Sequence, residues 1–335
     1  MSNAATSPSS GPRILVVRLG AMGDVIHALP AVASLKHSFP GSHLTWLIEA
    51  PWATLLEQNP YVDRIAIFER GNPGAWMRNW SKLRAERFDF AVDFQGLVKS
   101  ALAASMAWPD RIFGFHQSHV RERAAALFYS NKTKPQSAHQ VDRNLELAAA
   151  AGAASILRTF PLPPGEPEGE LPAGGFVLAS PMAGWRAKQW PLAFYSRLAT
   201  RLERELELPL VLNGPADMGE LANVPSALVH HSSVAGLIHA TRRATAVVGV
   251  DSGPLHLAAA LAKIGVGIFG PTNPAMNGPY GNTLSVLRSE RAVTSYKRRS
   301  VIDAGMREID PDRVFEALKA QLIRHSASCA TQPIS

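Results

Sequence analysis

The chain has 335 residues, and 46% of them are hydrophobic, so the sequence predicts packed cores in two domains and excludes a largely disordered protein. Its single cysteine, Cys329, excludes a disulfide framework and a cysteine-based metal site, and it fits a reducing compartment. The net charge is +7; residues 1–165 hold 17 Lys and Arg against 12 Asp and Glu, and residues 166–335 hold 17 against 15, which suggests an anionic partner for the first half.

Strands and helices alternate along the first half. The small polar residues 1–12 predict a disordered tail, without the apolar centre of a signal peptide. Apolar spacing predicts a helix over 24–37, which Pro30 should kink or break unless the helix starts there, and a second helix over 141–153. Short apolar runs predict four strands, at 13–19, 43–49, 64–69 and 88–96.

The stretch 161–174 is rich in Pro, Gly and Glu and predicts a linker between an N-terminal domain over 13–160 and a C-terminal domain over 175–325. After it the alternation restarts. Two such runs predict an α/β protein with two Rossmann-like domains that face a cleft, and we expect the last helix to pack back on the first domain. The elements predicted in the second run are strands at 176–181, 208–214, 245–251 and 266–270, and helices at 191–205, 234–244 and 253–262.

Three loops of the second domain follow strands, where parallel sheets bind ligands. In "VDSGPLH", Asp251 or Ser252 can be the N-cap of a helix whose free N–H groups bind an anion, with His256 one turn inside; an ordinary capped helix is the alternative. In "SPMAGWRAKQWP", Lys188 suits a phosphate. In "VLNGPADMGE", Asp217 and Glu220 can accept from ribose hydroxyls.

The first domain opens with "RLGAMGDVIHALP", a turn without the dinucleotide spacing G-x-G-x-x-G. Its two glycines would let a substrate approach the backbone closely. Asp24 falls in the first turn of the predicted helix, where the helix dipole favours an ionised carboxylate, and such a group in a cleft can act as a general base. The alternative is an acid that only stabilises its helix.

Several segments, in this order and spacing, resemble the lipopolysaccharide heptosyltransferases of glycosyltransferase family 9. The likeness runs from about Arg13 to Arg313, and "FQGLVKSA" together with "LFYSNK…HQVDRN" is most similar to the heptosyltransferase I members of that family. The segments are "RLGAMGDVIHALPAV", "DFQGLVKSALAA", "LFYSNK…HQVDRNLEL", "KQWP", "VDSGPLHLAAAL" and "FGPTNP…GPYG".

This resemblance implies the B-type glycosyltransferase fold and an inverting transfer of L-glycero-D-manno-heptose from ADP-heptose to Kdo of the lipopolysaccharide inner core. Asp24 matches the proposed base and Lys188 matches the phosphate-binding lysine. No metal or other cofactor is required, because Lys188 and a helix N-terminus can carry the developing charge. The donor loop of the family is matched by Asp251, Ser252, Gly253 and His256.

The implied acceptor, Kdo-lipid A, carries carboxylates and phosphates, which accounts for the positive first half. A monomeric, cytoplasmic enzyme, peripheral at the inner face of the inner membrane and touching it transiently through basic residues, is implied. The acceptor-binding candidates are Arg18, Gly23, Lys99 and Arg121, and a basic helical stretch adds Arg78, Lys82 and Arg84.

Two departures from the family pattern concern the donor. Ala183 and Gly184 stand where heptosyltransferase I members can have threonines, so backbone groups alone would contact the phosphates there. The first acid of "NGPAD" comes one place late, so Asp217 and Glu220 both stay candidates for the ribose.

Other functions stay open at this point. These are a heptosyltransferase II or another family 9 transferase with a different donor or acceptor, a non-catalytic nucleotide-sugar-binding protein, and an NAD-dependent dehydrogenase, which the missing G-x-G-x-x-G disfavours. No basic run interleaved with aromatics and no zinc spacing supports nucleic acid.

Overall fold

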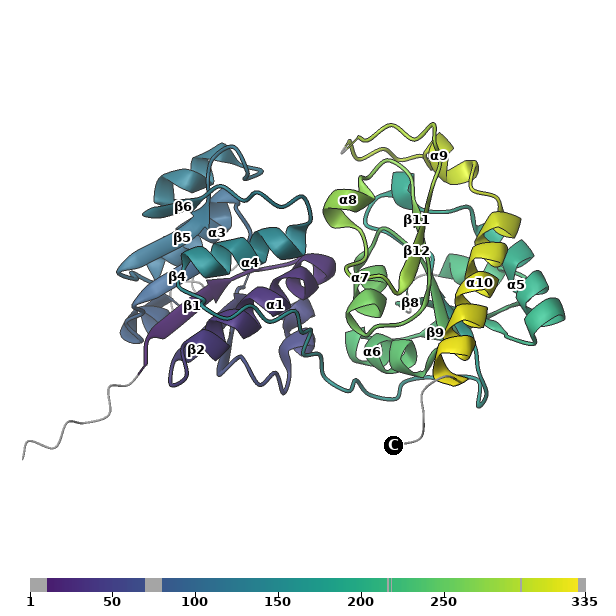
Figure 1. Ribbon diagram of the computed structural model, residues 1–335, viewed down its shortest axis with the longest axis horizontal. Helices are drawn as coiled ribbons and strands as arrows, with labels where there is room; N and C mark the ends of the chain where they lie inside the picture. Colours follow the sequence, from purple (N-terminus) through teal and green to yellow (C-terminus); the bar gives the residue numbers. More distant parts are fainter. Residues whose placement is uncertain (1–10, 70–79, 216, 218, 296, 331–335) are drawn as a thin grey trace, which may run out of the picture. The chain divides into compact units, whose positions relative to one another are not determined.

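The computed structural model describes residues 11–69, 80–215, 217, 219–295 and 297–330. The chain divides into two compact units, the N-terminal unit Met1–Leu162 and the C-terminal unit Pro163–Ser335 (Figure 1). Most of the predicted tail, residues 1–10, lies outside the described residues.

The N-terminal unit is built on a sheet of six parallel strands in the order β3-β2-β1-β4-β5-β6. The central strand β1 pairs on both sides, with Val16 opposite Trp46 of β2 and opposite Val92 of β4. All four residues from Ile14 to Val17 are buried, as the apolar run predicts. The strands are β1 (Arg13–Val17), β2 (His43–Ile48), β3 (Arg64–Ile67), β4 (Phe90–Asp93), β5 (Arg111–Phe115) and β6 (Asn131–Thr133).

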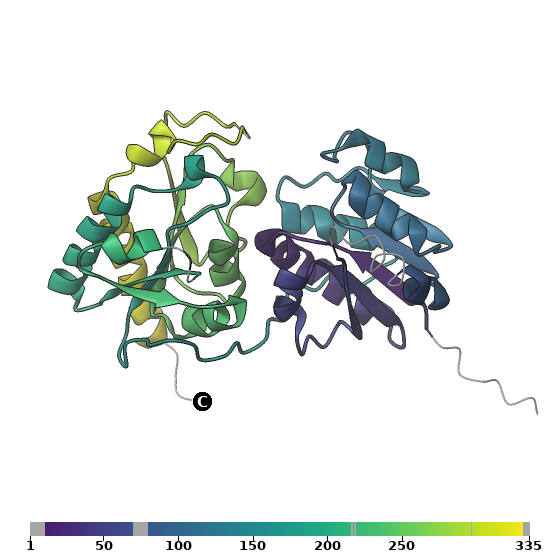
Figure 2. The same cartoon turned by 180° about the vertical axis from the view of Figure 1, so that it is seen from behind.

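Helices cover both faces of this sheet, with α1 packed on α4 and α3 beside β1 and β4 (Figures 1 and 2). Residues 80–85 are also helical. The helices are α1 (Met22–Ser38), α3 (Val98–Met106) and α4 (Gln140–Ala150), with 3₁₀ turns η1 (Ala50–Leu56) and η2 (Arg123–Phe128).

Helix α1 runs through Pro30 from Met22 to Ser38, so the expectation that Pro30 breaks or starts the first helix is wrong. A proline inside a helix removes one backbone hydrogen bond and costs about 3 kcal/mol. Here every side chain from Val25 to Leu35 is buried, and the burial of this apolar helix outweighs that cost. Ser34 Oγ also donates to the Pro30 carbonyl at 2.7 Å.

The C-terminal unit repeats the same architecture, with six parallel strands in the order β12-β11-β10-β7-β8-β9. The central strand β10 pairs with β7 and β11 and is buried along its whole length. The strands are β7 (Val177–Ser180), β8 (Leu210–Gly214), β9 (Ala227–His231), β10 (Ala246–Val250), β11 (Gly265–Phe269) and β12 (Leu284–Arg288). The predicted fold class, two doubly wound α/β units, is confirmed.

Helices α5 and α10 cover one face of the second sheet, and α6 and α7 cover the other (Figure 1). The core between sheet and helices contains the buried rings of Trp190, Tyr195 and Phe315. The helices are α5 (Leu192–Leu206), α6 (Val234–Arg243), α7 (Gly253–Ala260), α8 (Pro274–Asn277), α9 (Ala304–Arg307) and α10 (Pro311–Ala330), with 3₁₀ turns η3 (Arg186–Lys188) and η4 (Gly219–Asn223).

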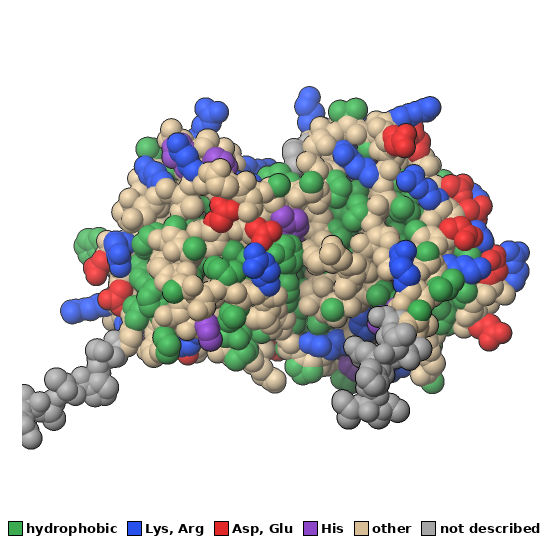
Figure 3. Space-filling model, in the orientation of Figure 1, with side chains coloured by type: hydrophobic (Ala, Val, Ile, Leu, Met, Phe, Trp, Pro, Cys, Tyr) green, Lys and Arg blue, Asp and Glu red, His purple; other side chains and the backbone are tan. Residues whose placement is uncertain are grey.

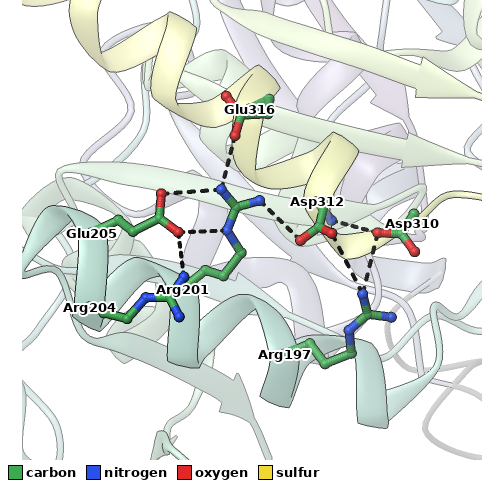
Figure 4. A network of polar contacts seen from close by, with 7 residues as sticks. All are labelled: Arg197, Arg201, Arg204, Glu205, Asp310, Asp312 and Glu316. Atoms are coloured by element: carbon green, nitrogen blue, oxygen red, sulfur yellow. Dashed lines mark hydrogen bonds and ion pairs between the residues drawn. The ribbon is translucent and has the colours of Figure 1, made fainter.

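A network of ion pairs joins α5 to α10 on the outside of this unit (Figure 4). Arg201 contacts Glu205 on its own helix at 2.9 Å, and it reaches Asp312 and Glu316 of α10 at 3.0 Å each. Its guanidinium also lies 3.8 Å from the centre of the Phe315 ring. Acidic and basic side chains accordingly gather together over α5 and α10 in the space-filling view (Figure 3).

Residues 163–173, inside the predicted linker, are bonded along α6 of the C-terminal unit. Arg242 Nη2 donates to the Pro163 carbonyl at 3.0 Å, and Arg243 Nη2 donates to the Pro172 carbonyl at 2.9 Å. The Glu168 carboxylate accepts from the backbone N–H of Ser233 at 2.7 Å. Proline has no backbone N–H to donate, but the carbonyls of Pro163 and Pro172 still accept from the arginines of α6.

None of the helices in the described part of the chain has a stretch both long and apolar enough to cross a bilayer.

Candidate active site

Each sheet places a pair of loops at the point where its strand order reverses. In the N-terminal unit this point lies between β1 and β4, and in the C-terminal unit it lies between β7 and β10. Doubly wound sheets bind ligands beyond the carboxyl ends of the strands at such a point. The residue predicted for catalysis and most of those predicted for donor binding fall in these loops, whereas Asp217 and Glu220 follow β8.

In the N-terminal unit, the turn after β1 carries Asp24 on a firm support. The Asp24 carboxylate lies 2.6 Å from Arg18 Nη2, and it accepts from the backbone N–H of Ala21, the N-cap of α1, at 3.3 Å. The Asp24 side chain is 45% exposed, whereas that of Arg18 is 9% exposed. The carboxylate is therefore held by two donors and still open to a reactant.

Arg18, a candidate for acceptor binding, is one of these donors. Its second nitrogen, Nη1, donates to the backbone carbonyl of Phe94, in the loop after β4, at 2.6 Å. The indole Nε1 of Trp46 donates to the Arg18 carbonyl at 3.1 Å. The guanidinium thus joins the β1 turn to the β4 loop.

The loop after β4 contributes residues that the sequence did not single out. Gln95 Oε1 accepts from the backbone N–H of Leu19 at 2.7 Å. Asp93 is completely buried, and it accepts from Tyr129 and Ser100 at 2.6 and 2.8 Å. Burial raises the pKa of Asp93, although these hydroxyls and nearby backbone N–H groups act in the opposite direction. The signal for this loop was the motif "DFQG", which begins at the last residue of a buried strand.

The other acceptor-binding candidates lie around the same end of the sheet, in different settings. Lys99, in the first turn of α3, pairs with Glu49 at 3.1 Å. Gly23 is buried in the first turn of α1, and Arg121 is exposed shortly before η2. Gly20 is partly exposed, and Trp52 occupies the place of a side chain on it, because a methyl group there would lie 2.7 Å from the Trp52 indole nitrogen.

The predicted basic stretch is described only in part. Lys82 and Arg84 lie in the helical residues 80–85, and Arg78 lies outside the described residues. The Arg84 guanidinium covers the ring of Trp108 at 4.3 Å.

In the C-terminal unit, the loops after β7 and β10 bring three predicted donor residues together. Lys188 Nζ lies 3.0 Å from Asp251 Oδ2, and His256 Nε2 lies 3.5 Å from Asp251 Oδ1. Burial acts to raise the pKa of Asp251, but the hydrogen bond from His256 and the charge of Lys188 outweigh it and hold this pKa well below its usual range. The three side chains form one charged cluster beside the start of α7.

Ser252 is the N-cap of α7, but its hydroxyl does not cap the helix. It donates instead to the Val250 carbonyl at 3.2 Å. Gly253 and Pro254 follow in the first turn, where proline costs no hydrogen bond. A helix N-terminus whose side-chain cap is turned away keeps its N–H groups for an anion.

The loop after β7 is shaped by Trp185. Lys188 Nζ lies 5.0 Å from the centre of the Trp185 ring, and the Arg298 guanidinium lies 5.8 Å from it. Gly184 is exposed, with open space where a side chain would be, and Ala183 packs on the core. Sequence reasoning missed Trp185 and Arg298, since Arg298 lies more than a hundred residues away in the chain.

The two candidates for a ribose contact follow β8. Asp217 is exposed in a turn, and Glu220 lies in η4, with its side chain outside the described part. Within the described residues, no group of three or more His, Cys, Asp and Glu side chains is placed to hold a metal ion.

Comparisons with known proteins agree with this arrangement. The family model of glycosyltransferase family 9 (heptosyltransferase) matches residues 76–303. Lipopolysaccharide heptosyltransferase 1 of Pseudomonas aeruginosa is 30% identical over 305 residues, which cover 83% of this chain and 84% of that protein. Lipopolysaccharide heptosyltransferase 1 of Escherichia coli K12 is 28% identical over 307 residues, which cover 83% of this chain and 94% of that protein.

Solved structures show the same fold. The E. coli heptosyltransferase WaaC with ADP superposes with a TM-score of 0.75 at 24% identity, over 92% of this chain and 99% of that one. E. coli ADP-heptose lps heptosyltransferase II superposes with a TM-score of 0.75 at 21% identity, over 94% and 99%. The chain is a glycosyltransferase, and it belongs to glycosyltransferase family 9, the heptosyltransferases.

Proposed function

We propose that this enzyme transfers L-glycero-D-manno-heptose from ADP-heptose to Kdo of the lipopolysaccharide inner core, with inversion of the anomeric centre. Relatives named lipopolysaccharide heptosyltransferase 1, at 28% and 30% identity over most of the chain, support heptose as the sugar and lipopolysaccharide as the acceptor. WaaC structures that contain ADP and ADP-2-deoxy-2-fluoro heptose support the donor.

The observation that carries the proposal is the supported, half-exposed carboxylate of Asp24. In this reaction the carboxylate takes the proton of the acceptor hydroxyl. The hydroxyl oxygen forms a bond to the anomeric carbon while the bond from that carbon to the diphosphate oxygen breaks. The electron pair of that bond leaves with ADP. Attack opposite the leaving group inverts the anomeric centre.

The cluster in the C-terminal unit supports a role in donor binding. Lys188 and the start of α7 offer a cation and backbone N–H groups to the diphosphate, and these can carry the charge that develops as ADP leaves. Asp251 holds Lys188 in place, and His256 contacts the other carboxylate oxygen of Asp251. Ribose binding falls to Asp217 or Glu220. We propose that no metal is needed for this step.

Lys99, Arg121 and the backbone at Gly23 are proposed to receive the anionic acceptor, whereas Arg18 is assigned to the support of Asp24. We propose that the enzyme is monomeric and cytoplasmic. Because Kdo-lipid A is a lipid, we also propose that the enzyme touches the inner membrane transiently through basic residues.

The test compares wild type with Asp24→Ala and Asp24→Asn, using ADP-heptose and Kdo-lipid A, with the product identified by mass spectrometry. Both variants should bind ADP normally in calorimetry and should lose turnover by about 10²–10⁴-fold, the usual contribution of a general base. Turnover close to wild type would reject the base assignment. An already heptosylated acceptor and a chelator are run in parallel. Transfer only to the heptosylated acceptor would reject Kdo as the acceptor, and loss of activity with the chelator would reject the proposal that no metal is needed.

A further inference from the structure

A buried polar network lies behind the catalytic turn of the N-terminal unit, and the proposed reaction does not use it directly. We propose that Asp93 is a positioning residue for the transfer reaction: it fixes the loop at 94–96, and this loop fixes the Asp24 carboxylate through Arg18. The inference rests on the proposed role of Asp24 as the base.

The network begins at the end of β4. Asp93 is 0% exposed, and its two carboxylate oxygens divide their partners. Oδ2 accepts from Tyr129 at 2.6 Å and from Ser100 at 2.8 Å, and Oδ1 accepts from the backbone N–H groups of Gln95 at 2.8 Å and Gly96 at 3.4 Å. Four donors from three segments thus meet on one side chain.

Two of these donors belong to the loop itself, so Asp93 determines its shape. Gly96 has φ +68°, a left-handed conformation that favours glycine. A methyl group on Gly96 would lie 2.9 Å from Val120 Cγ1, so the loop is also confined from outside. Tyr129 is confined in the same way, since a methyl group on Gly114 would lie 2.3 Å from its ring.

The loop passes this constraint to the turn after β1 through three hydrogen bonds. The Phe94 N–H donates to the Val17 carbonyl at 3.1 Å, and the Leu19 N–H donates to Gln95 Oε1 at 2.7 Å. The third bond runs from Arg18 Nη1 to the Phe94 carbonyl at 2.6 Å.

Arg18 completes the path, because its other nitrogen lies 2.6 Å from Asp24. Its side chain is 9% exposed, and both terminal nitrogens of the guanidinium are bonded, so a shift of the Phe94 carbonyl moves the guanidinium and, with it, the Asp24 carboxylate. Misplacement of a reacting group by about 1 Å can cost about 10²-fold in rate. If Asp93 served stability alone, its replacement would destabilise the fold but would not lower kcat in the protein that remains folded.

The test uses Asp93→Asn and, because a change in a buried hydrogen-bond network can unfold a protein, also Tyr129→Phe, which keeps the ring packed on Gly114 and removes one hydrogen bond. Each variant should lower kcat by about 10- to 100-fold while KM for ADP-heptose stays within about twofold. Ser34→Ala is the matched control, since Ser34 is buried on the same helix as Asp24 and bonds Pro30 and Leu157 instead. It should lower the melting temperature without this loss of kcat.

A double-mutant cycle with Arg18→Gln separates positioning from general destabilisation. If Asp93 acts through Arg18, then Tyr129→Phe should lower kcat by less than about twofold in the Arg18→Gln background. If the losses of kcat in Tyr129→Phe and Arg18→Gln are fully additive, or if folded Tyr129→Phe has an unchanged kcat, the inference is overturned. In either case an inactive Asp24→Ala leaves the assignment of Asp24 as the base standing. Normal turnover of Asp24→Ala would overturn both.

Discussion

Replacement of Lys188 by alanine gives the sharpest test of the donor site. In the structure Lys188 Nζ lies 3.0 Å from Asp251 and 5.0 Å from the Trp185 ring centre. Its side chain is 16% exposed and that of Asp251 is 8% exposed, so the cation lies in partly dry surroundings. Lys188→Ala removes this cation and leaves the strand ends of the C-terminal sheet in place.

The expected loss follows from one charge-assisted hydrogen bond to a phosphate, worth about 1.5–3 kcal/mol, or about 10- to 150-fold in Kd. ADP binding exchanges the contact with Asp251 for a contact with phosphate, which reduces the net gain. We therefore expect the lower part of the range, about 10- to 40-fold weaker binding of ADP.

Calorimetry with ADP, AMP and adenosine measures this loss. Arg186→Ala is the control, because Arg186 is an exposed cation in the same 3₁₀ turn as Lys188. The loss in Lys188→Ala should be greatest for ADP and should vanish for adenosine, which has no phosphate. Unchanged ADP affinity, an equal loss for adenosine, or an equal effect in Arg186→Ala would refute a direct phosphate contact.

Two further predictions concern stability. Asp251→Asn should lower the free energy of unfolding at about pH 7, and the difference in this free energy between variant and wild type should narrow below about pH 4. The pKa of Asp251 is lower in the folded protein than the unfolded value of 3.8, so its ionised form stabilises the fold above that value. This stabilisation is lost as the pH falls from the unfolded pKa through the folded pKa. Urea unfolding of both proteins at about pH 7 and well below pH 4 measures the two free energies, and a difference between them that does not change with pH would contradict the prediction. Arg201→Met should lower the melting temperature more than Arg204→Met, because Arg201 bridges α5 to Asp312 and Glu316 of α10 and Arg204 pairs within α5. Calorimetric scans in low and high salt measure both variants, and equal melting temperatures in low salt would speak against the bridge.

The central strands were predictable from sequence, and several outer ones were not. β1, β4, β7 and β10 are short apolar runs that are buried on both faces, which is the pattern of a parallel sheet. β6, β9 and β12 lie at sheet edges and have at most one buried residue each, so they lack a continuous apolar run; β6, with the sequence Asn-Lys-Thr, shows no apolar alternation at all. The prediction of a break or start at Pro30 failed because it relied on local helix propensity, which the burial of α1 overrides.

The sequence likewise identified several residues of the candidate site, but not the contacts between them. Lys188, Asp251 and His256 were identified individually from loops after strands, and the structure brings them together because β7 and β10 are neighbours. The support of Asp24 could not be derived, since it depends on which strand lies beside β1 and on the path of one buried arginine. "DFQG" was visible in the sequence, but its contact with the first turn appears only once β4 pairs with β1.

The two sheets share one strand order, counted from the first strand of each unit. Mutational tolerance is therefore expected to be uneven in the same way in both halves. The strands and the helices packed on them are constrained by volume, while the four loops at the reversal points combine buried anchors, such as Leu19 and Gly96, with exposed positions, such as Gly184, that can change without repacking a core. In evolutionary terms, one half can acquire a new partner molecule while the other keeps its own, so that specificity for each substrate can diverge separately on an unchanged pair of frames.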